Sequence, residues 1–171
     1  KKTFGGHLRF FGIGGAPLAA EVEEFLKKAH FPYAIGYGLT ETAPLIAGCA
    51  PKATFLRSTG PVLKGVELRI ADPKTSTGEG EIQARGPNIF KGYWKDEART
   101  KEAFTEDGWF RTGDLGSIDN KGRLFVRGRL KTLILGASGE NIYPEEIESI
   151  LNQMPEVEES LVVEEEDGLT A

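Results

Sequence analysis

The chain has 171 residues, of which 39% are hydrophobic and 27% are charged, and its formal net charge is −5. This composition is typical of a globular protein and excludes a disordered one, and no apolar run approaches the roughly 20 residues that cross a bilayer. The acidic balance argues against a protein that binds nucleic acid through its phosphates. A lone cysteine, Cys49, cannot form an internal disulfide, which favours a reducing, cytoplasmic compartment. One cysteine and two isolated histidines also exclude a zinc or thiol enzyme.

The first sixty residues predict a strand, a helix and a second strand. Residues 8–13 (LRFFGI) predict a short buried strand, and Pro17 suits the first residue of a helix. In the following LAAEVEEFLKKAH, apolar residues recur at helical spacing, with glutamates early and lysines late as the helix dipole favours. PYAIGYG then predicts the second strand. A unit of this kind places two parallel strands side by side, and ligands bind at the carboxyl edge of such sheets.

From about residue 60, short segments of alternating polarity are separated by turn residues. VELRIAD, EGEIQARG, GDLGSID and GRLFVRG predict an antiparallel sheet or a partly open barrel. After Leu130 we expect a strand, a glycine-rich turn, a helix with Pro144 near its start, and another strand in SLVVEE. The expected fold class is therefore mixed α/β: the βαβ edge of a parallel sheet, a small antiparallel sheet, and the start of an α+β C-terminal domain. The expected domains are 1–58, 59–129 and an incomplete 130–171.

The stretch YGLTET, residues 37–42, combines an aromatic ring, a glycine, two hydroxyls and one carboxylate within a single turn. A nucleotide with a metal ion on its phosphates needs a flat apolar face, a bare backbone, hydroxyl donors and a fixed negative charge. An ordinary turn after a strand, with Tyr37 as packing and Glu41 solvated, is the alternative.

Five stretches occur in order: GGAPL, GYGLTET, GEGEIQARGPNIFKGYWKDEARTKEAF, GWFRTGDLG and GRLKTLILGASGENIYPEEIE. Together they resemble the adenylate-forming superfamily of acyl-CoA synthetases, luciferase-like enzymes and peptide-synthetase adenylation domains. The last stretch looks most like long-chain fatty-acid-CoA ligases. The resemblance implies that a carboxylate is joined to the α-phosphate of ATP and that a thiol then displaces AMP. It also implies ATP or AMP, Mg²⁺ and CoA as cofactors, and small molecules as partners.

Four residues of the opening stretch receive roles from this resemblance. The ring of Tyr37 would lie against adenine, and Gly38 would let the backbone come close. Thr40 would bind a phosphate oxygen and Glu41 would hold Mg²⁺, a hard cation that prefers carboxylate oxygen. Thr40 and Glu41 are therefore the expected catalytic residues.

Further residues would surround the same nucleoside. Gly15, Ala16 and Pro17 would line the pocket, although a bare strand-to-helix turn also explains them. Asp114 in TGDLG would accept hydrogen bonds from both ribose hydroxyls, because a carboxylate offers lone pairs on two oxygens. Arg129 would reach the ribose or the phosphates. A turn aspartate and a surface ion pair are the respective alternatives.

The resemblance also implies a moving C-terminal domain. Lys131 matches the hinge about which that domain rotates, and residues 136–141 would border the path of CoA, with Gly139, Glu140 and Asn141 on the CoA side. An ordinary turn before a helix explains the same loop. The two tryptophans, Trp94 and Trp109, are expected to pack in the core or barrel.

No stretch matches the family's serine-, threonine- and glycine-rich phosphate loop, and the catalytic lysine of the C-terminal domain is expected beyond Ala171. The chain is accordingly expected to be an inactive fragment of a longer ligase. An amino-acid or aryl-acid adenylating enzyme stays open, as do the oligomeric state and a peripheral membrane contact of the parent. A noncatalytic interaction module is the rival from another class, and it is favoured if Tyr37, Glu41 and Asp114 do not converge.

Overall fold

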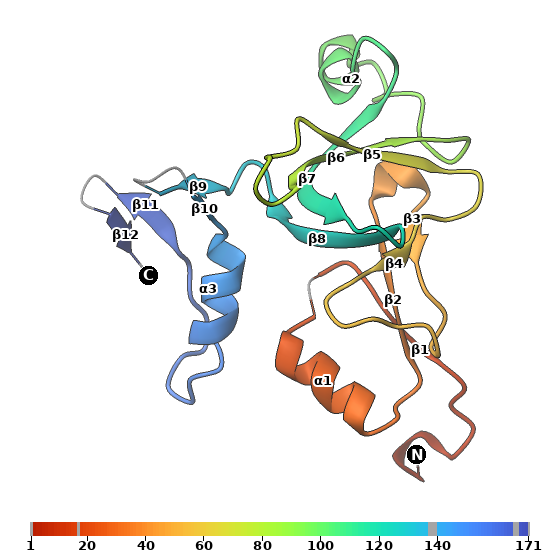
Figure 1. Ribbon diagram of the computed structural model, residues 1–171, viewed down its shortest axis with the longest axis vertical. Helices are drawn as coiled ribbons and strands as arrows, with labels where there is room; N and C mark the ends of the chain where they lie inside the picture. The colour runs from red at the N-terminus through yellow and green to blue at the C-terminus, as the bar shows by residue number, and fades with distance from the viewer. Residues whose placement is uncertain (1, 17, 137–139, 166–167, 171) are drawn as a thin grey trace.

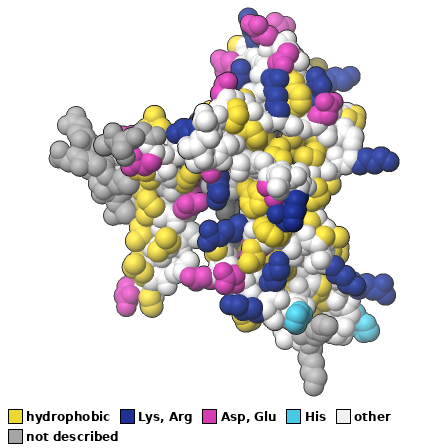
Figure 2. Space-filling model, in the orientation of Figure 1, with side chains coloured by type: hydrophobic (Ala, Val, Ile, Leu, Met, Phe, Trp, Pro, Cys, Tyr) yellow, Lys and Arg dark blue, Asp and Glu magenta, His cyan; other side chains and the backbone are white. Residues whose placement is uncertain are grey.

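The computed structural model describes residues 2–16, 18–136, 140–165 and 168–170. Its elements fall into three parts along the chain, a small sheet with one helix, a five-stranded sheet, and a C-terminal part that lies to one side of the latter (Figure 1). No helix among these described residues is long and apolar enough to span a bilayer. Lysine and arginine side chains are scattered over the visible face and do not gather in one patch (Figure 2).

The first part is a three-stranded sheet in the order β1-β2-β3. A 3-10 turn at Lys2–Phe4 precedes β1 (Phe11–Ile13), α1 (Ala20–Lys28), β2 (Tyr33–Gly38) and β3 (Leu45–Gly48). The strands β1 and β2 are parallel and joined through α1, which confirms the predicted βαβ unit. The strand β3, antiparallel to β2, was not predicted. The helix begins at Ala20 and not at Pro17 as predicted, and Pro17 itself lies outside the described residues. The first strand is also shorter and more exposed than predicted, since Phe11 at its start is exposed.

The helix α1 leaves two of its regularly spaced apolar residues in solvent and buries an acidic one. Val22 and Phe25 are exposed, whereas the carboxylate-bearing Glu23 is only 1% exposed. The Glu23 side chain accepts hydrogen bonds from the Tyr33 hydroxyl (3.0 Å) and from the backbone N–H of Arg57 (2.8 Å). A polar contact therefore ties the helix to β2 and to the loop before β4.

The second part is an open antiparallel sheet in the order β4-β8-β7-β6-β5. Its strands are β4 (Gly60–Pro61), β5 (Glu67–Ala71), β6 (Gly80–Arg85), β7 (Phe110–Ile118) and β8 (Arg123–Arg129). The four long strands match the four segments of alternating polarity, so the predicted antiparallel sheet is confirmed. A bridge between Ala47 and Val62 joins the two sheets, and the core contains Ala47, Ile82 and Leu124.

The connection between β6 and β7 contains an unpredicted helix, α2 (Glu97–Ala103). Asp96 caps it, because the Asp96 carboxylate accepts the backbone N–H of Arg99 at 3.0 Å. Trp94, just before this helix, is 88% exposed, so the prediction that it packs in the core or barrel was wrong. Lys95 has a φ of 53°, and the chain turns there towards α2, which leaves the indole outside the sheet.

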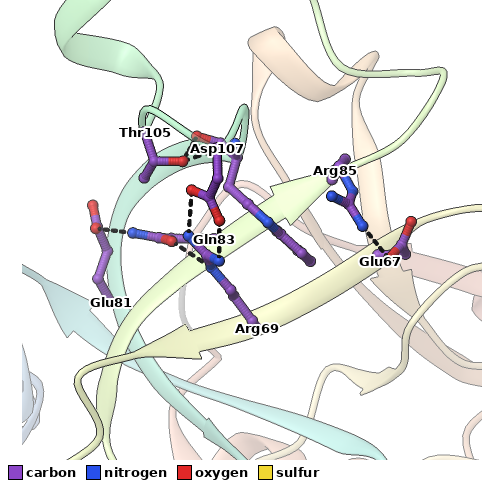
Figure 3. A network of polar contacts seen from close by, with 8 residues as sticks. Glu67, Arg69, Glu81, Gln83, Arg85, Thr105 and Asp107 are labelled. Carbon is purple, nitrogen blue, oxygen red and sulfur yellow. Dashed lines mark hydrogen bonds and ion pairs between the residues drawn. The ribbon is translucent and has the colours of Figure 1, made fainter.

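Trp109 confirms its predicted packing role, with 8% exposure. The guanidinium carbons of Arg69 and Arg85 lie 4.6 and 4.5 Å from its ring centroid. Arg69 in turn donates two hydrogen bonds to Asp107, and Arg85 pairs with Glu67 (Figure 3). A network of charged side chains thus covers the indole on this face of β5, β6 and β7.

The third part follows β8. It contains β9 (Ile134–Leu135), β10 (Asn141–Ile142), α3 (Pro144–Leu151), β11 (Val163–Glu165) and β12 (Gly168–Thr170). Pro144 is the first helical residue of α3, as predicted, because its missing N–H costs nothing there. The strand β12 pairs with β11, which adds an unpredicted partner to the last strand. The predicted domain boundaries at 58/59 and 129/130 stay predictions.

Candidate functional site

The structure brings together three predicted site residues from three strands. The Tyr37 hydroxyl, near the end of β2, donates a hydrogen bond to Asp114 Oδ2 at 2.6 Å. Arg129 Nε lies 3.0 Å from Asp114 Oδ1, since Asp114 on β7 and Arg129 on β8 stand opposite each other in the sheet register. Tyr37 and Asp114 are 77 residues apart in the chain, so the contact joins the first sheet to the second.

The backbone beside Asp114 is held by the sheet. The Asp114 N–H donates to the Thr112 hydroxyl at 3.1 Å, and that hydroxyl donates to the Ile82 carbonyl at 2.7 Å. Thr112 is buried, and no local pattern in the sequence indicated its role. The carboxylate therefore projects from a backbone fixed by the neighbouring strand.

Burial shapes the electrostatics of this cluster. It raises the pKa of Asp114 above the ordinary value of 3.8, while the Tyr37 hydrogen bond and the Arg129 charge pull it down. The pKa of Tyr37 is raised strongly, first by burial and then by the neighbouring Asp114 carboxylate. The shared proton consequently stays on the phenol, and Asp114 acts as the acceptor.

Gly38 has a packing reason in this chain as well as a predicted one. A Cβ at Gly38 would overlap the carbonyl of Pro44, because the chain folds back closely between β2 and β3. The predicted approach of a ligand to this backbone stays a prediction.

Glu41 lies in the 3-10 turn Thr40–Thr42 that follows β2. Its carboxylate accepts the Tyr93 hydroxyl at 3.0 Å, and its carbonyl accepts the Phe90 N–H at 2.8 Å. Tyr93 was not among the predicted site residues; the Phe90 ring packs against it with centroids 4.9 Å apart. The segment 90–93 thus holds the predicted metal ligand in place.

The two hydroxyls of the opening stretch differ in their surroundings. Thr42 is fully buried; its Oγ1 accepts the Leu39 N–H at 2.9 Å, and its single O–H lies within hydrogen-bond distance of the Pro44 and Leu39 carbonyls, at 2.5 and 2.9 Å. Thr42 therefore shapes the turn. Thr40, predicted to bind a phosphate oxygen, is exposed and accessible to a ligand.

Among the described residues, no group of three or more His, Cys, Asp or Glu side chains is arranged to hold a metal ion. Mg²⁺ in nucleotide sites is usually held by one or two carboxylates together with the substrate phosphates. The single carboxylate of Glu41 fits that arrangement, with the remaining ligands supplied by a bound nucleotide.

The other predicted residues are placed as follows. Gly15 and Ala16 are exposed after β1, Lys131 is exposed two residues after the end of β8, and Glu140 is exposed before β10. Asn141 is half-buried and donates to the Tyr143 hydroxyl at 3.1 Å. Pro17 and Gly139 lie outside the described residues.

The family model for "AMP-binding enzyme" matches residues 1–94. The chain is 39% identical over 163 residues to the long-chain-fatty-acid–CoA ligase FadD15 of Mycobacterium bovis, covering 95% of this chain and 26% of that protein. It is 41% identical over 160 residues to the 2-succinylbenzoate–CoA ligase of Bacillus licheniformis, covering 91% of this chain and 33% of that protein. The chain thus spans about a quarter to a third of these relatives.

A similar solved structure is the O-succinylbenzoate coenzyme A synthetase MenE of Bacillus subtilis in complex with ATP and magnesium ion. The TM-score is 0.79 at 36% identity, over 95% of this chain and 35% of that one.

Proposed function

Because the chain belongs to the AMP-binding enzyme family, we propose that it carries the nucleoside-contacting residues of an AMP-forming acyl-CoA ligase. The observation that carries the proposal is the cluster of Tyr37, Asp114 and Arg129, in which a buried carboxylate is joined to an aromatic ring from another sheet. A chance turn aspartate would not need this partner 77 residues away.

Asp114 has acceptor capacity left for a ribose. A carboxylate offers about four lone-pair sites, and Tyr37 and Arg129 use one site on each oxygen. Two adjacent ribose hydroxyls need two further acceptor sites, which the same carboxylate can supply. The hydroxyl of Tyr37 anchors its ring beside Asp114, where the ring presents a flat face to adenine.

Thr40 and Glu41 follow β2, the strand that carries Tyr37, and would interact with the phosphates of the nucleotide. The exposed Thr40 hydroxyl is available to a phosphate oxygen, and Glu41 would hold Mg²⁺ with Tyr93 orienting its carboxylate. Mg²⁺, when bound, neutralises charge as one anion attacks another. Gly15, Ala16 and Pro17 would border the nucleoside, and Gly139, Glu140 and Asn141 would lie on the CoA side.

For the acid, we propose a long-chain fatty acid, which is supported by the 39% identity to FadD15 across 95% of the chain. An aryl acid is the second candidate, supported by the 41% identity to a 2-succinylbenzoate–CoA ligase. Non-hydrolysable acyl-adenylate analogues separate the two. A dodecanoyl analogue should bind more tightly than AMP and than the 2-succinylbenzoyl analogue if the first candidate is right, and the reverse order favours the second.

Isothermal titration calorimetry with AMP tests the nucleoside site directly. Asp114→Asn keeps the side-chain shape and removes the charge, and we expect the Kd for AMP to rise at least about tenfold, since hydrogen bonds to charged groups contribute roughly 1.5–3 kcal/mol. Asp119→Asn is the matched control. Asp119 also lies near β7 and pairs with an arginine, Arg123, but serves a turn at the other end of the strand.

Circular dichroism of each variant shows whether it has kept its fold. AMP binding that is unchanged in folded Asp114→Asn, or weakened equally by Asp119→Asn, would contradict the assignment of the ribose to this carboxylate.

A further inference from the structure

The C-terminal part of the chain is attached to the five-stranded sheet by a side-chain junction. In Figure 1 the elements β9 to β12 and α3 lie beside that sheet and follow the end of β8. The turn between β5 and β6, residues 72–79, supplies the sheet's side of the junction, and Asn141 and Tyr143 supply the other.

Glu79 stands at the centre of this junction. Its Oε1 accepts Arg127 Nε from β8 at 2.9 Å, and its Oε2 accepts the Tyr143 hydroxyl at 2.9 Å. The Glu79 side chain is 11% exposed, so the carboxylate is nearly withdrawn from water. Each oxygen thus meets a donor from a different part of the chain.

A second arm runs parallel to the first. Asn141 Nδ2 donates to the Tyr143 hydroxyl at 3.1 Å, and Lys74 Nζ donates to Asn141 Oδ1 at 2.6 Å. Burial and the Glu79 carboxylate raise the pKa of Tyr143, while the Asn141 hydrogen bond and the charge of Arg127 lower it. The phenol therefore remains the donor to Glu79 and the acceptor from Asn141.

The turn that carries Lys74 and Glu79 is organised by its own backbone. The Lys74 N–H donates to the Glu79 carbonyl at 2.8 Å, and the Gly78 N–H donates to the Lys74 carbonyl at 2.8 Å. The backbone that carries both side chains is therefore closed into a turn by hydrogen bonds within the sheet side of the junction.

The C-terminal part also approaches β8 closely at Gly128. A Cβ at Gly128 would stand 3.2 Å from both Tyr143 Cδ1 and Glu145 Oε2, tighter than ordinary packing. Glu145 Oε1 accepts the Thr132 hydroxyl at 2.7 Å, across the segment that joins the two parts. Because Gly128 has no side chain, Tyr143 and Glu145 can lie this close to the backbone of β8.

We propose that Glu79 is a latch that holds the described residues 130–136 and 140–165 in the observed orientation against the five-stranded sheet, by joining Arg127 on β8 to Tyr143 at the start of α3. The latch engages Asn141, a residue expected on the CoA side, so in the latched orientation the Asn141 amide is committed to Lys74 and Tyr143. Release of Tyr143 from Glu79 frees the connection after Arg129 to adopt other directions. This inference concerns orientation and stands apart from the nucleotide and acid assignments.

Distance measurements between two spin labels test the latch in the 171-residue chain. Labels are placed at exposed Lys121→Cys, in the turn before β8, and Gln153→Cys, after α3, in a Cys49→Ser background. The doubly labelled chain with Glu79 intact, which is the parent of the variants below, should give one narrow distance by double electron–electron resonance. Glu79→Ala should raise the ratio of molecules with a changed label distance to molecules with the original distance at least about tenfold. A hydrogen bond to a charged group stabilises the bonded state by an equilibrium factor of about that size. Tyr143→Phe should shift it in the same direction by less.

Glu81→Ala is the matched control. The Glu81 side chain is 12% exposed and pairs with Arg111, so it resembles Glu79 in burial and partner, but its bonds stay within the sheet. Its distance distribution should equal that of the parent. A narrow, parent-like distance in folded Glu79→Ala, or equal broadening in Glu81→Ala, would overturn the latch. Where circular dichroism shows that Glu79→Ala has unfolded, Tyr143→Phe decides: its unchanged distance refutes the proposal.

Discussion

Glu23 offers a sharp test of how the first sheet is attached to the second. Its carboxylate is buried on α1 and accepts the Tyr33 hydroxyl and the Arg57 N–H. Arg57 has a φ of 62°, a conformation that a residue with a side chain rarely adopts, so this hydrogen bond also stabilises an unfavourable turn. Glu23→Ala would remove the carboxylate that accepts from both donors, of which Tyr33 is buried and Arg57 is exposed.

The magnitude follows from those two donors. Loss of the acceptor of a buried donor such as Tyr33 costs about 1–3 kcal/mol, and loss of an ordinary hydrogen bond such as that of Arg57 costs about 0.5–1.5 kcal/mol, so Glu23→Ala should lower the free energy of unfolding by about 1.5–4.5 kcal/mol. Glu23→Gln should cost less than about 1.5 kcal/mol, because the amide oxygen can accept the Arg57 N–H and the NH₂ group can donate to the Tyr33 hydroxyl.

Urea denaturation followed by circular dichroism measures both effects as shifts of the midpoint. The neighbouring Glu24→Ala is the control: Glu24 is half exposed and pairs with Lys28 at 3.4 Å, so its loss should cost no more than about 0.5 kcal/mol. Equal midpoints for Glu23→Ala and Glu24→Ala would refute the claim that the buried contact stabilises this junction. So would a Gln variant as unstable as the Ala variant.

Three further predictions concern pH and the tryptophans. AMP affinity should fall as the pH drops through the raised pKa of Asp114, which lies above the ordinary 3.8, and calorimetry should find no such titration in Asp114→Asn. Because protonation of a carboxyl group whose pKa is raised in the folded state favours that state, this titration alone does not unfold the chain. The Arg69 hydrogen bonds lower the pKa of Asp107 from 3.8 to about 2, so the ionised Asp107 stabilises the fold above about pH 4 and this contribution is lost as the pH falls from about 4 to 2. Urea midpoints between these pH values should therefore change less in Asp107→Asn than in the unsubstituted chain, and an equal pH dependence of the two would contradict this role of Asp107. Trp109→Ala should cost about 3–5 kcal/mol and Trp94→Ala no more than about 0.5 kcal/mol in thermal or urea unfolding, because only Trp109 is buried, and comparable losses would be a contrary result.

Local patterns in the sequence predicted much of the fold. Alternating polarity located β5, β6, β7 and β8, and the helical spacing with Pro144 at the start located α3. These signals depend on neighbours a few residues apart, so they can be read without knowledge of the rest of the chain. The two-residue strand β4 and the seven-residue helix α2 were not predicted, because elements this short contain too few residues to show a clear hydrophobic periodicity.

Burial within an element was harder to predict than the element itself. In α1, apolar residues recur at helical spacing, yet the acidic Glu23 is buried while the apolar Phe25 is exposed. The direction in which Trp94 points was also decided by a turn at Lys95 and not by its apolar character. Periodicity identifies a helix face or a strand face, but the segment that packs against it comes from elsewhere in the chain.

The sequence by itself determined the four long strands of the second sheet and the helices α1 and α3, and it singled out Tyr37, Asp114 and Arg129 as candidates. Only the tertiary structure decided that Tyr37 meets Asp114 across 77 residues, that Tyr93 holds Glu41, and that Glu79 meets Tyr143. The physical reason is range. Backbone preferences act between near neighbours, whereas these contacts depend on the register of paired strands and on the turns that bring distant segments to the same place.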